Sequence, residues 1–583
     1  MKLIGSYLYK YRGVVLLAIF IKLIGTVTEL LLPSILEHII DDVVPSGQLS
    51  QVLLWGLGMF AAAVACRQLN VMANRRAIDN AHKISYEVRQ KLFEKTLSLE
   101  GAQFDAIGLP SLISRMTSDS YNVQSAVQQA QSLCVRAPMM LVGGVIVAGM
   151  MDFELTKIML VILPILIAIV LFVSSKGIPM YSKVQGKLDT VVRIMRENIT
   201  GIRVVKALSK EAREIERFRG VNREMTKSDI DAAMVMALPG PLMQLFLNIG
   251  LSAVVFYGAY RVNLGEIRPG VILAFLTYFN MIAMGVMGMN RIFMTMSKAS
   301  ASADRIRSVM ETPSEELPEI MTDETAKGGH IVFDHVSFSY GKEGGTASDF
   351  AGTGREKALD DISFEIKKGG SLGIIGPTGC GKTTIINLLM RFYVPDEGTI
   401  TIDDQNVLLY DRKELRDKFG TVFQNDMIFM DTLHGNIDFG RDLENSAIEA
   451  AVQESQAYEF IEELEDGLQY EAAIKGANLS GGQKQRLFVA RALAARPEIL
   501  VLDDSSSALD YKTDAAMRNA IKKNHGNTTL IMIAQRVSSV MNLDQILVLD
   551  DGHCIGYGTH EELLKTCDTY REIYEVQMGA MAE

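Results

Sequence analysis

A glycine-rich segment in the C-terminal half has the residue types needed to bind the phosphates of a nucleotide. It follows the apolar run Ser371–Ile375, has the spacing GxxxxGK followed by Thr, and precedes a helix-like run. Its glycines would let backbone N–H groups point at phosphate oxygens, Lys382 would bring positive charge to them, and the Thr383 hydroxyl suits Mg²⁺. We predict nucleotide contacts throughout this phosphate loop, which consists of Gly376, Pro377, Thr378, Gly379, Cys380, Gly381, Lys382, Thr383 and Thr384.

Two adjacent carboxylates follow a second apolar run. Ile499–Leu502 has the pattern of a buried strand, and Asp503 and Asp504 come directly after it. Ligands of open α/β sheets bind beyond the carboxyl ends of the strands. We therefore expect Asp503 to lie near the Mg²⁺ of a bound nucleotide. Upstream, Leu479–Gln483 precedes a helix-like run that leads into this strand.

The composition indicates an apolar part joined to a water-soluble part. The chain has 583 residues, of which 48% are hydrophobic and 22% charged, so it is long enough for more than one domain. Its net charge of -11 gives no case for nucleic-acid binding. We expect reduced thiols, not disulfides or a metal site, at Cys66, Cys134, Cys380, Cys554 and Cys567, which are odd in number and widely spaced.

Six apolar stretches in the N-terminal half are long enough, or nearly so, to cross a bilayer, which needs roughly 20 residues. They are Val14–Leu32, Val52–Leu69, Leu133–Met151, Ile158–Val173, Met234–Tyr260 and Val271–Met296. The first follows Lys2, Lys10 and Arg12 without a clean cleavage site. We interpret it as an uncleaved transmembrane helix and not as a signal peptide.

Lysine and arginine are unevenly distributed among the connections between these stretches. Residues 72–132 contain seven and residues 174–233 contain thirteen, whereas residues 33–51 contain none. The positive-inside rule therefore places both long connections, both termini and the C-terminal half in the cytoplasm. We predict a multi-pass protein of a bacterial-type plasma membrane, in contact with membrane lipid.

Each long connection is polar but helical in pattern, and each is interrupted once. Half of such a connection would extend roughly 45 Å below the membrane as a helix, and a helix of that length needs something on which to dock. We predict docking turns at Phe104–Leu112, which contains Gly108 and Pro110, and at Glu197–Lys206. The alternative is a solvated loop.

Two spans contain residues that could contact a transported molecule. Lys22 and Glu29 lie on one face of the first span, and charges at that depth usually face a cavity or a partner; the alternative places them near the ends of a partly embedded helix. The last span carries Met281, Met284, Met287, Met289, Met294 and Met296, with Asn280, Asn290 and Arg291. Methionine adapts to varied apolar shapes, so we expect either a promiscuous binding face or residues that face lipid or pack between helices.

A polar segment separates the two parts. Residues Lys298–Ile320 contain Pro313 and Pro318, which favours a domain boundary there. We predict a multidomain fold: an all-α transmembrane domain of six helices over residues 1–312, a linker over 313–328, and an α/β P-loop nucleotide-binding domain over 329–583.

The motif Leu479–Gln483 is the signature of ATP-binding cassette (ABC) proteins, and six spans before one cassette resemble an ABC exporter half-transporter over nearly the whole chain. The resemblance implies that two half-transporters pair head to tail and enclose two ATP molecules. Each ATP, with its Mg²⁺, would contact one chain's phosphate loop and the other chain's signature. In this chain the residues contacting the partner's ATP would be Ser480, Gly481, Gly482 and Gln483.

The resemblance also implies roles for residues outside these two motifs. Tyr340 would stack on the adenine, and Asp510 would act across the dimer. Gln424, together with Thr383 and Asp503, would surround the Mg²⁺.

The chain departs from the family pattern at two catalytic positions. In the family, a Glu that acts as general base follows the Asp near the Mg²⁺, and in this chain Asp504 occupies that position. The family also has a His in a segment further along the chain, and Gln535 replaces it here. These substitutions resemble the degenerate subunit of heterodimeric multidrug-type ABC exporters. Glu471 lies where, in the family, a loop of the cassette senses the cytoplasmic helices, although Ile474 replaces the second acidic residue of that loop. Separately, the segment 341–357 is a glycine-rich insertion relative to the family.

The sequence therefore predicts an ATPase that exports small amphipathic molecules, drugs, lipids or peptides as one half of a heterodimer, with hydrolysis mainly at the partner's site. Three alternatives stay open. They are a regulatory, ATP-gated subunit that does not transport, an importer of a cargo such as a metal chelate, and a homodimer with two slow sites.

Overall fold

The computed structural model of the chain describes residues 2–313, 329–340, 357–505 and 508–582. The predicted linker, apart from Pro313, and the glycine-rich insertion, apart from Lys357, lie outside the described residues. The chain divides into two compact units: a membrane unit of Met1–Leu97 with Pro110–Thr312, and a nucleotide unit of Ser98–Leu109 with Pro313–Glu583. The short segment Ser98–Leu109 thus packs with the nucleotide unit although it lies within the N-terminal half of the sequence.

Six helical spans in the described residues are apolar enough to cross a membrane, which confirms the predicted number. They cover Arg12–Val43, Leu49–Ser98, Leu109–Met151, Phe153–Thr200, Glu211–Asn263 and Pro269–Met310, and each contains one of the predicted stretches. The shortest has 32 residues, more than the roughly 20 that a bilayer needs. The helices therefore continue beyond the membrane, as the pattern of the long connections predicts.

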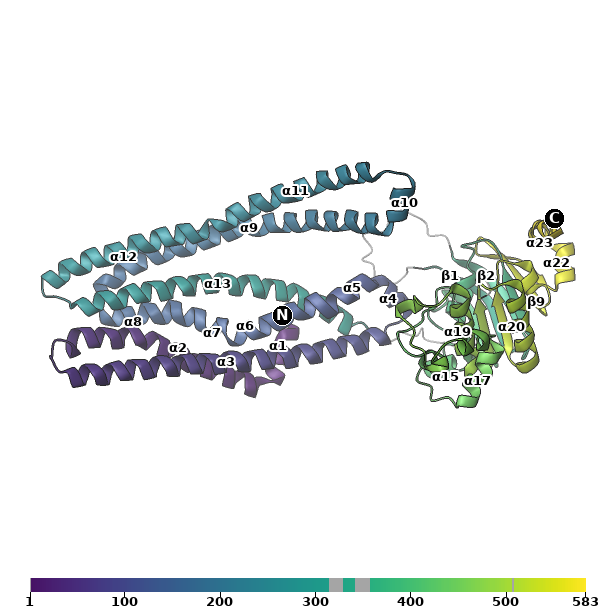
Figure 1. Cartoon of the computed structure of the whole chain (residues 1–583), viewed down its shortest axis with the longest axis horizontal. Helices are drawn as coiled ribbons and strands as arrows, with labels where there is room; N and C mark the ends of the chain where they lie inside the picture. The colour runs from purple at the N-terminus through teal and green to yellow at the C-terminus, as the bar shows by residue number, and fades with distance from the viewer. Residues whose placement is uncertain (1, 314–328, 341–356, 506–507, 583) are drawn as a thin grey trace. The chain divides into compact units, whose positions relative to one another are not determined.

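The helices of the N-terminal half run in the following order (Figure 1). They are α1 (Lys2–Lys10), α2 (Arg12–His38) with the π-turn η1 (Ile39–Val43), α3 (Leu49–Ser98), α4 (Gly101–Ile107), α5 (Leu109–Ser114), η2 (Arg115–Asp119), α6 (Ser120–Gln131), α7 (Leu133–Pro138), η3 (Met139–Gly143), α8 (Gly144–Met151), α9 (Phe153–Thr200), α10 (Ile202–Ala207), α11 (Glu211–Ala237), α12 (Pro239–Asn263) and α13 (Pro269–Met310). Pro138 removes a backbone donor within the third span, and the π-turn η3 follows it directly.

Helix α13 forms the centre of the membrane unit. It packs against α2, α6, α7, α8 and α12. Phe275 and Tyr278 on α13 are fully buried, and the Tyr278 hydroxyl donates to the Leu30 carbonyl oxygen at 2.8 Å. Of the predicted methionine face, Met281 is buried in this core, whereas Met284 is 49% exposed. In this methionine face, Met281 therefore contributes to helix packing, whereas Met284 is accessible from outside the unit.

The two charged residues of the first span lie in the interior of α2 and have partners inside the unit. Lys22 is buried, and its Nζ donates to Asn70 Oδ1 at 2.8 Å and to Asn74 Oδ1 at 3.1 Å. Glu29 Oε1 accepts from Arg136 Nη2 at 2.7 Å. Both charges therefore have partners inside the unit, and their depth in the membrane stays a prediction.

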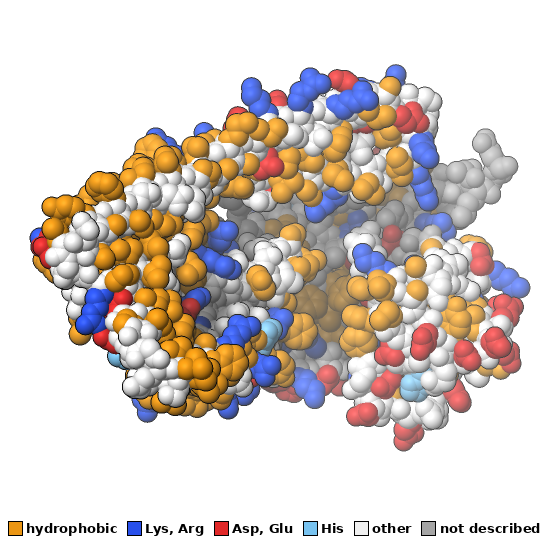
Figure 2. Space-filling view, turned by 60° about the vertical axis from the view of Figure 1, so that its left-hand side comes forward, with side chains coloured by type: hydrophobic (Ala, Val, Ile, Leu, Met, Phe, Trp, Pro, Cys, Tyr) orange, Lys and Arg blue, Asp and Glu red, His pale blue; other side chains and the backbone are white. Residues whose placement is uncertain are grey.

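Charge and hydrophobicity divide the surface of the membrane unit as the sequence predicts. In Figure 2, hydrophobic side chains cover the part of the unit that comes forward, while Lys and Arg side chains gather along α11. The last part of α9, helix α10 and most of α11 correspond to the Lys- and Arg-rich connection 174–233. This connection is helical, but it is interrupted twice and not once: at Gly201, inside the predicted docking turn, and at residues 208–210, beyond it.

The described residues of the nucleotide unit form two sheets. In the first, β1 (Ile331–Phe338) lies between β2 (Leu359–Ile366) and β4 (Glu397–Ile402), and β5 (Gln405–Asn406) pairs with β4. The second has the order β10-β9-β3-β8-β7-β6, with β3 (Ser371–Ile375), β6 (Phe419–Val422), β7 (Ile499–Asp503), β8 (Thr529–Ile533), β9 (Gln545–Asp550) and β10 (His553–Gly558). Strands β9, β3, β8, β7 and β6 are parallel, and β10 is antiparallel.

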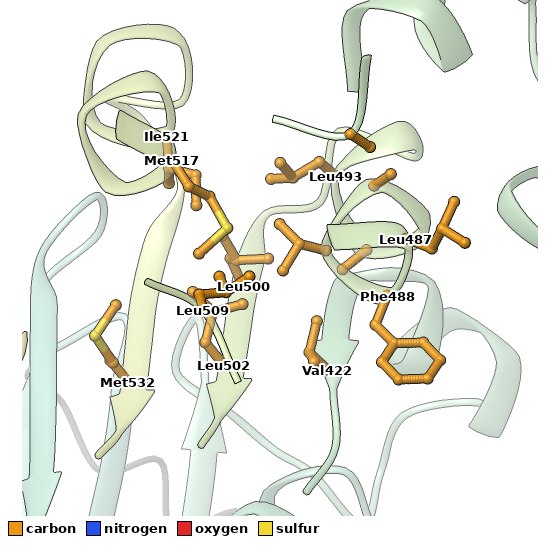
Figure 3. Packing of buried hydrophobic residues seen from close by; sticks show 14 of the residues in the cluster. Val422, Leu487, Phe488, Leu493, Leu500, Leu502, Leu509, Met517, Ile521 and Met532 are labelled. Atoms are coloured by element: carbon orange, nitrogen blue, oxygen red, sulfur yellow. The ribbon is translucent and has the colours of Figure 1, made fainter. Parts of the chain in front are cut away.

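Helices cover the six-stranded sheet and bury its apolar side chains. The helices of this unit after α4 are α14 (Lys382–Leu389), α15 (Arg412–Asp417), α16 (Leu433–Asp438), α17 (Asn445–Glu454), α18 (Tyr458–Glu462), the 3₁₀ turns η4 (Gly467–Gln469) and η5 (Ile474–Gly476), α19 (Gly481–Ala494), α20 (Tyr511–Asn524), α21 (Val537–Val540), α22 (His560–Thr566) and α23 (Asp568–Ala582). Figure 3 shows Leu493 of α19 and Met517 of α20 beside Leu500 of β7. The apolar run of β7 is thus buried, as its sequence indicates.

Helix α4 packs on the nucleotide unit at the first predicted docking turn. The turn begins at Gly101 and not at Phe104, and Gly108, with a φ of 77°, separates α4 from α5. The Tyr393 hydroxyl donates to Asp105 Oδ2, and Arg412 Nη2 lies 3.4 Å from Glu100 Oε1. Burial and the Asp105 carboxylate raise the pKa of Tyr393, so Tyr393 remains a hydrogen-bond donor to Asp105 at neutral pH.

We predict that residues 33–51 face the outside and residues 174–233 face the cytoplasm. In a background without the five native cysteines, Gln48→Cys should react with a membrane-impermeant thiol reagent on intact cells. Glu197→Cys should react only after the cells are permeabilised, because it precedes the interruption in a Lys- and Arg-rich connection. Labelling of Glu197→Cys but not of Gln48→Cys on intact cells would refute this topology.

We also predict that the Tyr393–Asp105 hydrogen bond holds α4 in place. Tyr393→Phe keeps the ring but removes the donor, and a hydrogen bond to a charged group contributes about 1.5–3 kcal/mol. Hydrogen–deuterium exchange of the α4 amides should therefore accelerate by about tenfold or more. The matched control is Tyr458→Phe, which removes a similar hydroxyl bond to Glu462, 2.7 Å long, elsewhere on the same unit. If both variants leave α4 exchange unchanged, the hydroxyl does not hold α4.

Candidate ATP-binding and hydrolysis site

Four parallel strands bring the predicted site residues to one edge of the sheet. The phosphate loop follows β3, Gln535 follows β8, Asp503 ends β7, and Gln424 follows β6. The strands are neighbours in the order β3-β8-β7-β6. Because the carboxyl ends of parallel strands lie at the same edge, the four segments converge there.

The phosphate loop has the backbone that its glycines predict. Gly381 lies in the left-handed region with a φ of 97° and forms the N-cap of α14. A Cβ atom there would lie 2.5 Å from the Ala358 carbonyl oxygen, so a side chain is excluded both by conformation and by space. Lys382 Nζ donates to the carbonyl oxygens of Gly376 and Pro377 at 2.9 and 2.7 Å. Its charge is therefore held beside the loop at the start of a helix, an arrangement that favours phosphate binding.

The phosphate loop and the strand β7 meet at a hydroxyl–carboxylate contact. Thr383 Oγ1 donates to Asp503 Oδ2 at 2.9 Å. Burial raises the pKa of Asp503, and the Thr383 hydrogen bond partly offsets this effect. A hydroxyl and a carboxylate beside a phosphate site fit Mg²⁺, which proteins usually bind through one or two carboxylates together with substrate phosphates. Thr383 and Asp503 would thus hold the ion, which would neutralise phosphate charge when bound.

Gln424, the third predicted Mg²⁺ contact, is exposed two residues after β6. Gln424 lies at the same sheet edge as Thr383 and Asp503, which is consistent with its predicted place near a bound Mg²⁺. Its contact with Mg²⁺ stays a prediction.

The two unusual residues contact each other. Gln535 Nε2 donates to Asp504 Oδ2 at 3.2 Å. Asp504 has a positive φ of 50°, and its backbone N–H donates to the Ile533 carbonyl oxygen at 3.0 Å. Burial raises the pKa of Asp504, against the opposing charges of Lys382 and Arg536. The Asp504 carboxylate is therefore held by an amide, which cannot take up a proton as an imidazole can.

A glutamine that the sequence reasoning did not single out connects this pair to the signature helix. Gln485 Nε2 donates to the Asp504 carbonyl oxygen at 3.2 Å, and Gln485 Oε1 accepts from the Ala508 N–H at 2.9 Å. Gln485 lies in α19, two residues after the signature. The sequence gives only a weak indication that Gln485 belongs to the site, because most polar residues of an amphipathic helix are solvated.

The signature forms the first turn of α19 and not a loop before it. Ser480 is the N-cap, where its Oγ accepts from the Gln483 N–H at 3.3 Å and its own N–H donates to Gln483 Oε1 at 2.8 Å. This reciprocal pair is a capping box, which the spacing Ser-x-x-Gln predicts. Ser480 and Gly481 are exposed, while Leu479 is buried and anchors the turn. The exposed N-terminus of α19 thus offers N–H groups and the positive end of the helix dipole to an anion.

Two further predicted residues have local partners. The Tyr340 hydroxyl donates to Thr384 Oγ1 at 3.1 Å, and the Tyr340 ring, which is 41% exposed, lies edge-on to Tyr393 at 5.1 Å. Asp510 caps α20, and hydrogen bonds from the Thr513 N–H and hydroxyl lower its pKa. Tyr340 is therefore beside the phosphate loop, as adenine stacking requires. The adenine contact and the cross-dimer role of Asp510 stay predictions.

Glu471, the predicted sensor of the cytoplasmic helices, forms an isolated β-bridge with Thr432. Ile474, which replaces that loop's second acid, is 65% exposed. The sensing role of Glu471 stays a prediction.

Known proteins share both units of the chain. The family profile "ABC transporter transmembrane region" matches residues 15–286, and the profile "ABC transporter" matches residues 359–507. The uncharacterized ABC transporter ATP-binding protein YfiB of Bacillus subtilis is 34% identical over 577 residues, which cover 98% of each chain. The probable multidrug resistance ABC transporter ATP-binding/permease protein YheI of the same organism is 30% identical and covers 100% of this chain and 98% of its own.

A solved structure shows the same fold. A bacterial Atm1-family ABC exporter with ATP bound aligns with a TM-score of 0.79 at 22% identity, over 97% of this chain and 98% of its own. The predicted fold class is thereby confirmed, and an ABC cassette implies ATP binding and ATPase activity in general. The chain belongs to the ABC transporter family, as a plasma-membrane half-transporter with six membrane-spanning helices and one ATP-binding cassette.

Proposed function

We propose that the chain is one half of a heterodimeric exporter whose own nucleotide site hydrolyses ATP slowly, while its signature completes a fast site on a partner chain. The observation that supports this assignment best is the hydrogen-bonded pair of Asp504 and Gln535 beside an intact signature. The degenerate residues and the intact motif serve different ATP molecules in a head-to-tail dimer, so both can belong to one working complex.

The geometry around Asp504 argues against efficient hydrolysis at this chain's own site. The Asp504 side chain is one methylene shorter than Glu, and Gln535 engages its carboxylate. A positioned general base contributes typically 10²–10⁴-fold, and a displacement of about 1 Å forfeits much of that effect. The phosphate loop with the Thr383–Asp503 contact still fits ATP and Mg²⁺. This site would therefore bind nucleotide tightly and act mainly in a structural role.

The helices of the membrane unit support a second chain as partner. Ala232 is the one buried residue of α11, and within the described helix α10 no side chain is buried. Apolar side chains at the end of α9 and along α10 and α11 are nevertheless exposed. They include Ile199 at 71%, Val204 at 61% and Met234 at 67%. Exposed apolar surface of this kind marks an interface or a lipid-facing surface. Residues 199–208 lie outside the apolar stretches, which favours contact with the partner chain.

The proposed cargo is a small amphipathic molecule, a drug, a lipid or a peptide. Met284 and Met287 are 49% and 51% exposed on α13 and could adapt to varied apolar shapes. The similarity to YheI, which is named a probable multidrug resistance transporter, supports this class. Closure of the cassettes would move α4 and, through the continuous chain, α3 and α5, and would turn the cavity outward.

A homodimer with two slow sites is the second candidate. It is favoured by the intact Thr383–Asp503 contact, which would let each copy of this chain bind ATP with Mg²⁺. The two candidates differ in whether the chain alone reaches its full ATPase rate.

We predict that damage to the signature impairs the complex more than damage to Asp504. Ser480→Arg should lower the ATPase rate of the complex with its partner by roughly 100-fold or more, because a catalytic site loses preorganised charge stabilisation. Asp504→Asn should cost far less, because its contribution as a general base is already compromised. Both variants are measured as purified complexes at saturating ATP.

The matched control is Ser446→Arg, at an exposed serine in the first turn of α17 in the same unit. It should leave the rate unchanged and thereby exclude a general effect of an added arginine. If Asp504→Asn abolishes turnover while Ser480→Arg leaves it intact, this chain contains the working site and the assignment is reversed.

A further inference from the structure

A recess of about 490 Å³ lies beside the junction of α1 and α2 in the membrane unit. Lys10 and Tyr11 line it from the junction. The remaining lining comes from one face of α3 and consists of His82, Lys83, Tyr86 and Glu87. Cationic and aromatic side chains therefore predominate in this recess, and none of them belongs to the nucleotide site.

Positive charge exceeds negative charge in the recess. Glu87 is shared among several donors: Lys10 and Lys91 both bind its Oε1, the latter at 3.1 Å, and the Tyr11 hydroxyl donates to its Oε2 at 2.9 Å. Lys83 has no hydrogen-bond or ion-pair partner anywhere in the part of the chain that the structure describes. Glu87 thus pairs with Lys10 and Lys91, and the charge of Lys83 is available to an anion.

With Leu49 at the predicted outer end of α3, helix length puts the recess near the level of the cytoplasmic headgroups. His82 comes 33 residues after Leu49, the first residue of α3 at the outer end, a distance of about 50 Å along a helix. A bilayer with its headgroups is about 40–45 Å thick, and an average tilt of about 20° shortens the depth that a helix covers. The span Arg12–Val43 gives the same level, since its 32 residues extend about 48 Å.

The aromatic side chains around the recess are those of a membrane interface. Tyr9 and Tyr86 are 70% and 67% exposed, and the Arg12 guanidinium lies 5.0 Å from the centre of the Tyr9 ring. Ile4 and Tyr7 on the other face of α1 are buried in the membrane unit. Tyrosine is enriched where headgroups meet water, and basic residues at the cytoplasmic surface attract anionic lipid.

We propose that this recess binds the headgroup of an anionic phospholipid of the cytoplasmic leaflet. Its phosphate would lie between Lys10 and Lys83, and its glycerol part would contact the Tyr86 ring. The bound lipid would hold the α1–α2 junction against α3 at the start of the first span. The recess belongs to a single chain, so the site is complete without a partner subunit.

The test compares lipid retention by the full chain. The protein is purified from nanodiscs that contain phosphatidylglycerol or phosphatidylcholine, and native mass spectrometry counts the lipids that remain bound. Wild-type protein should retain phosphatidylglycerol in preference to phosphatidylcholine. Lys83→Gln should weaken phosphatidylglycerol retention by about fivefold, the effect of one lysine near an anionic surface, and Lys83→Arg should preserve it.

The control is Lys227→Gln, which removes a lysine charge from α11. Lys227 lies about 54 Å from Asn263, the outer end of its span, and is therefore at a depth similar to that of the recess. It should leave retention unchanged. The proposal is overturned if Lys83→Gln retains as much phosphatidylglycerol as wild type does, or if Lys227→Gln weakens retention equally. It is also overturned if inorganic phosphate displaces the lipid as effectively as short-chain phosphatidylglycerol does, because the site would then take free phosphate.

Discussion

Parallel pairing of β3, β8, β7 and β6 is the constraint on which the nucleotide site depends. It brings segments more than 100 residues apart in the sequence to one sheet edge, where Thr383 donates to Asp503 and Gln535 donates to Asp504. These side chains meet only because the strands share direction and register. The buried apolar strand β7 ends at Asp503, so Asp503 and the following Asp504 lie at this edge beside the segments that follow β3 and β8. The chemistry of the site is therefore a consequence of packing in the core below it.

Patterns within a short stretch of sequence predict the local parts of this structure well. The strand before the phosphate loop has the predicted bounds Ser371–Ile375, and the six apolar stretches all lie in helices of sufficient length. The glycines of the phosphate loop predict an unusual backbone, and Gly381 indeed has a left-handed conformation that few other residues adopt. In these cases the physical cause, whether hydrophobic periodicity or backbone freedom, lies within a few residues.

Contacts between distant residues could not be predicted in the same way. The sequence singles out Asp504 and Gln535 as separate departures, but their hydrogen bond follows from the neighbouring positions of β7 and β8. Tyr393 gave no sequence signal, because its contact with Asp105 joins residues 288 positions apart. The start of α19 was missed for a different reason. The glycines at 481 and 482 resemble a loop, and only the capping box of Ser480 and Gln483 shows that the helix begins there.

The central claim is that Asp504 and Gln535 together limit hydrolysis at this chain's own site. It is tested most directly by restoring both residues, Asp504→Glu with Gln535→His, in the chain purified alone, and measuring ATPase turnover at saturating ATP. The account predicts a slow wild-type chain and a rise of roughly 100-fold or more in the double variant, because a general base and its imidazole partner are regained. A wild-type chain that already hydrolyses ATP as fast as the double variant would contradict it.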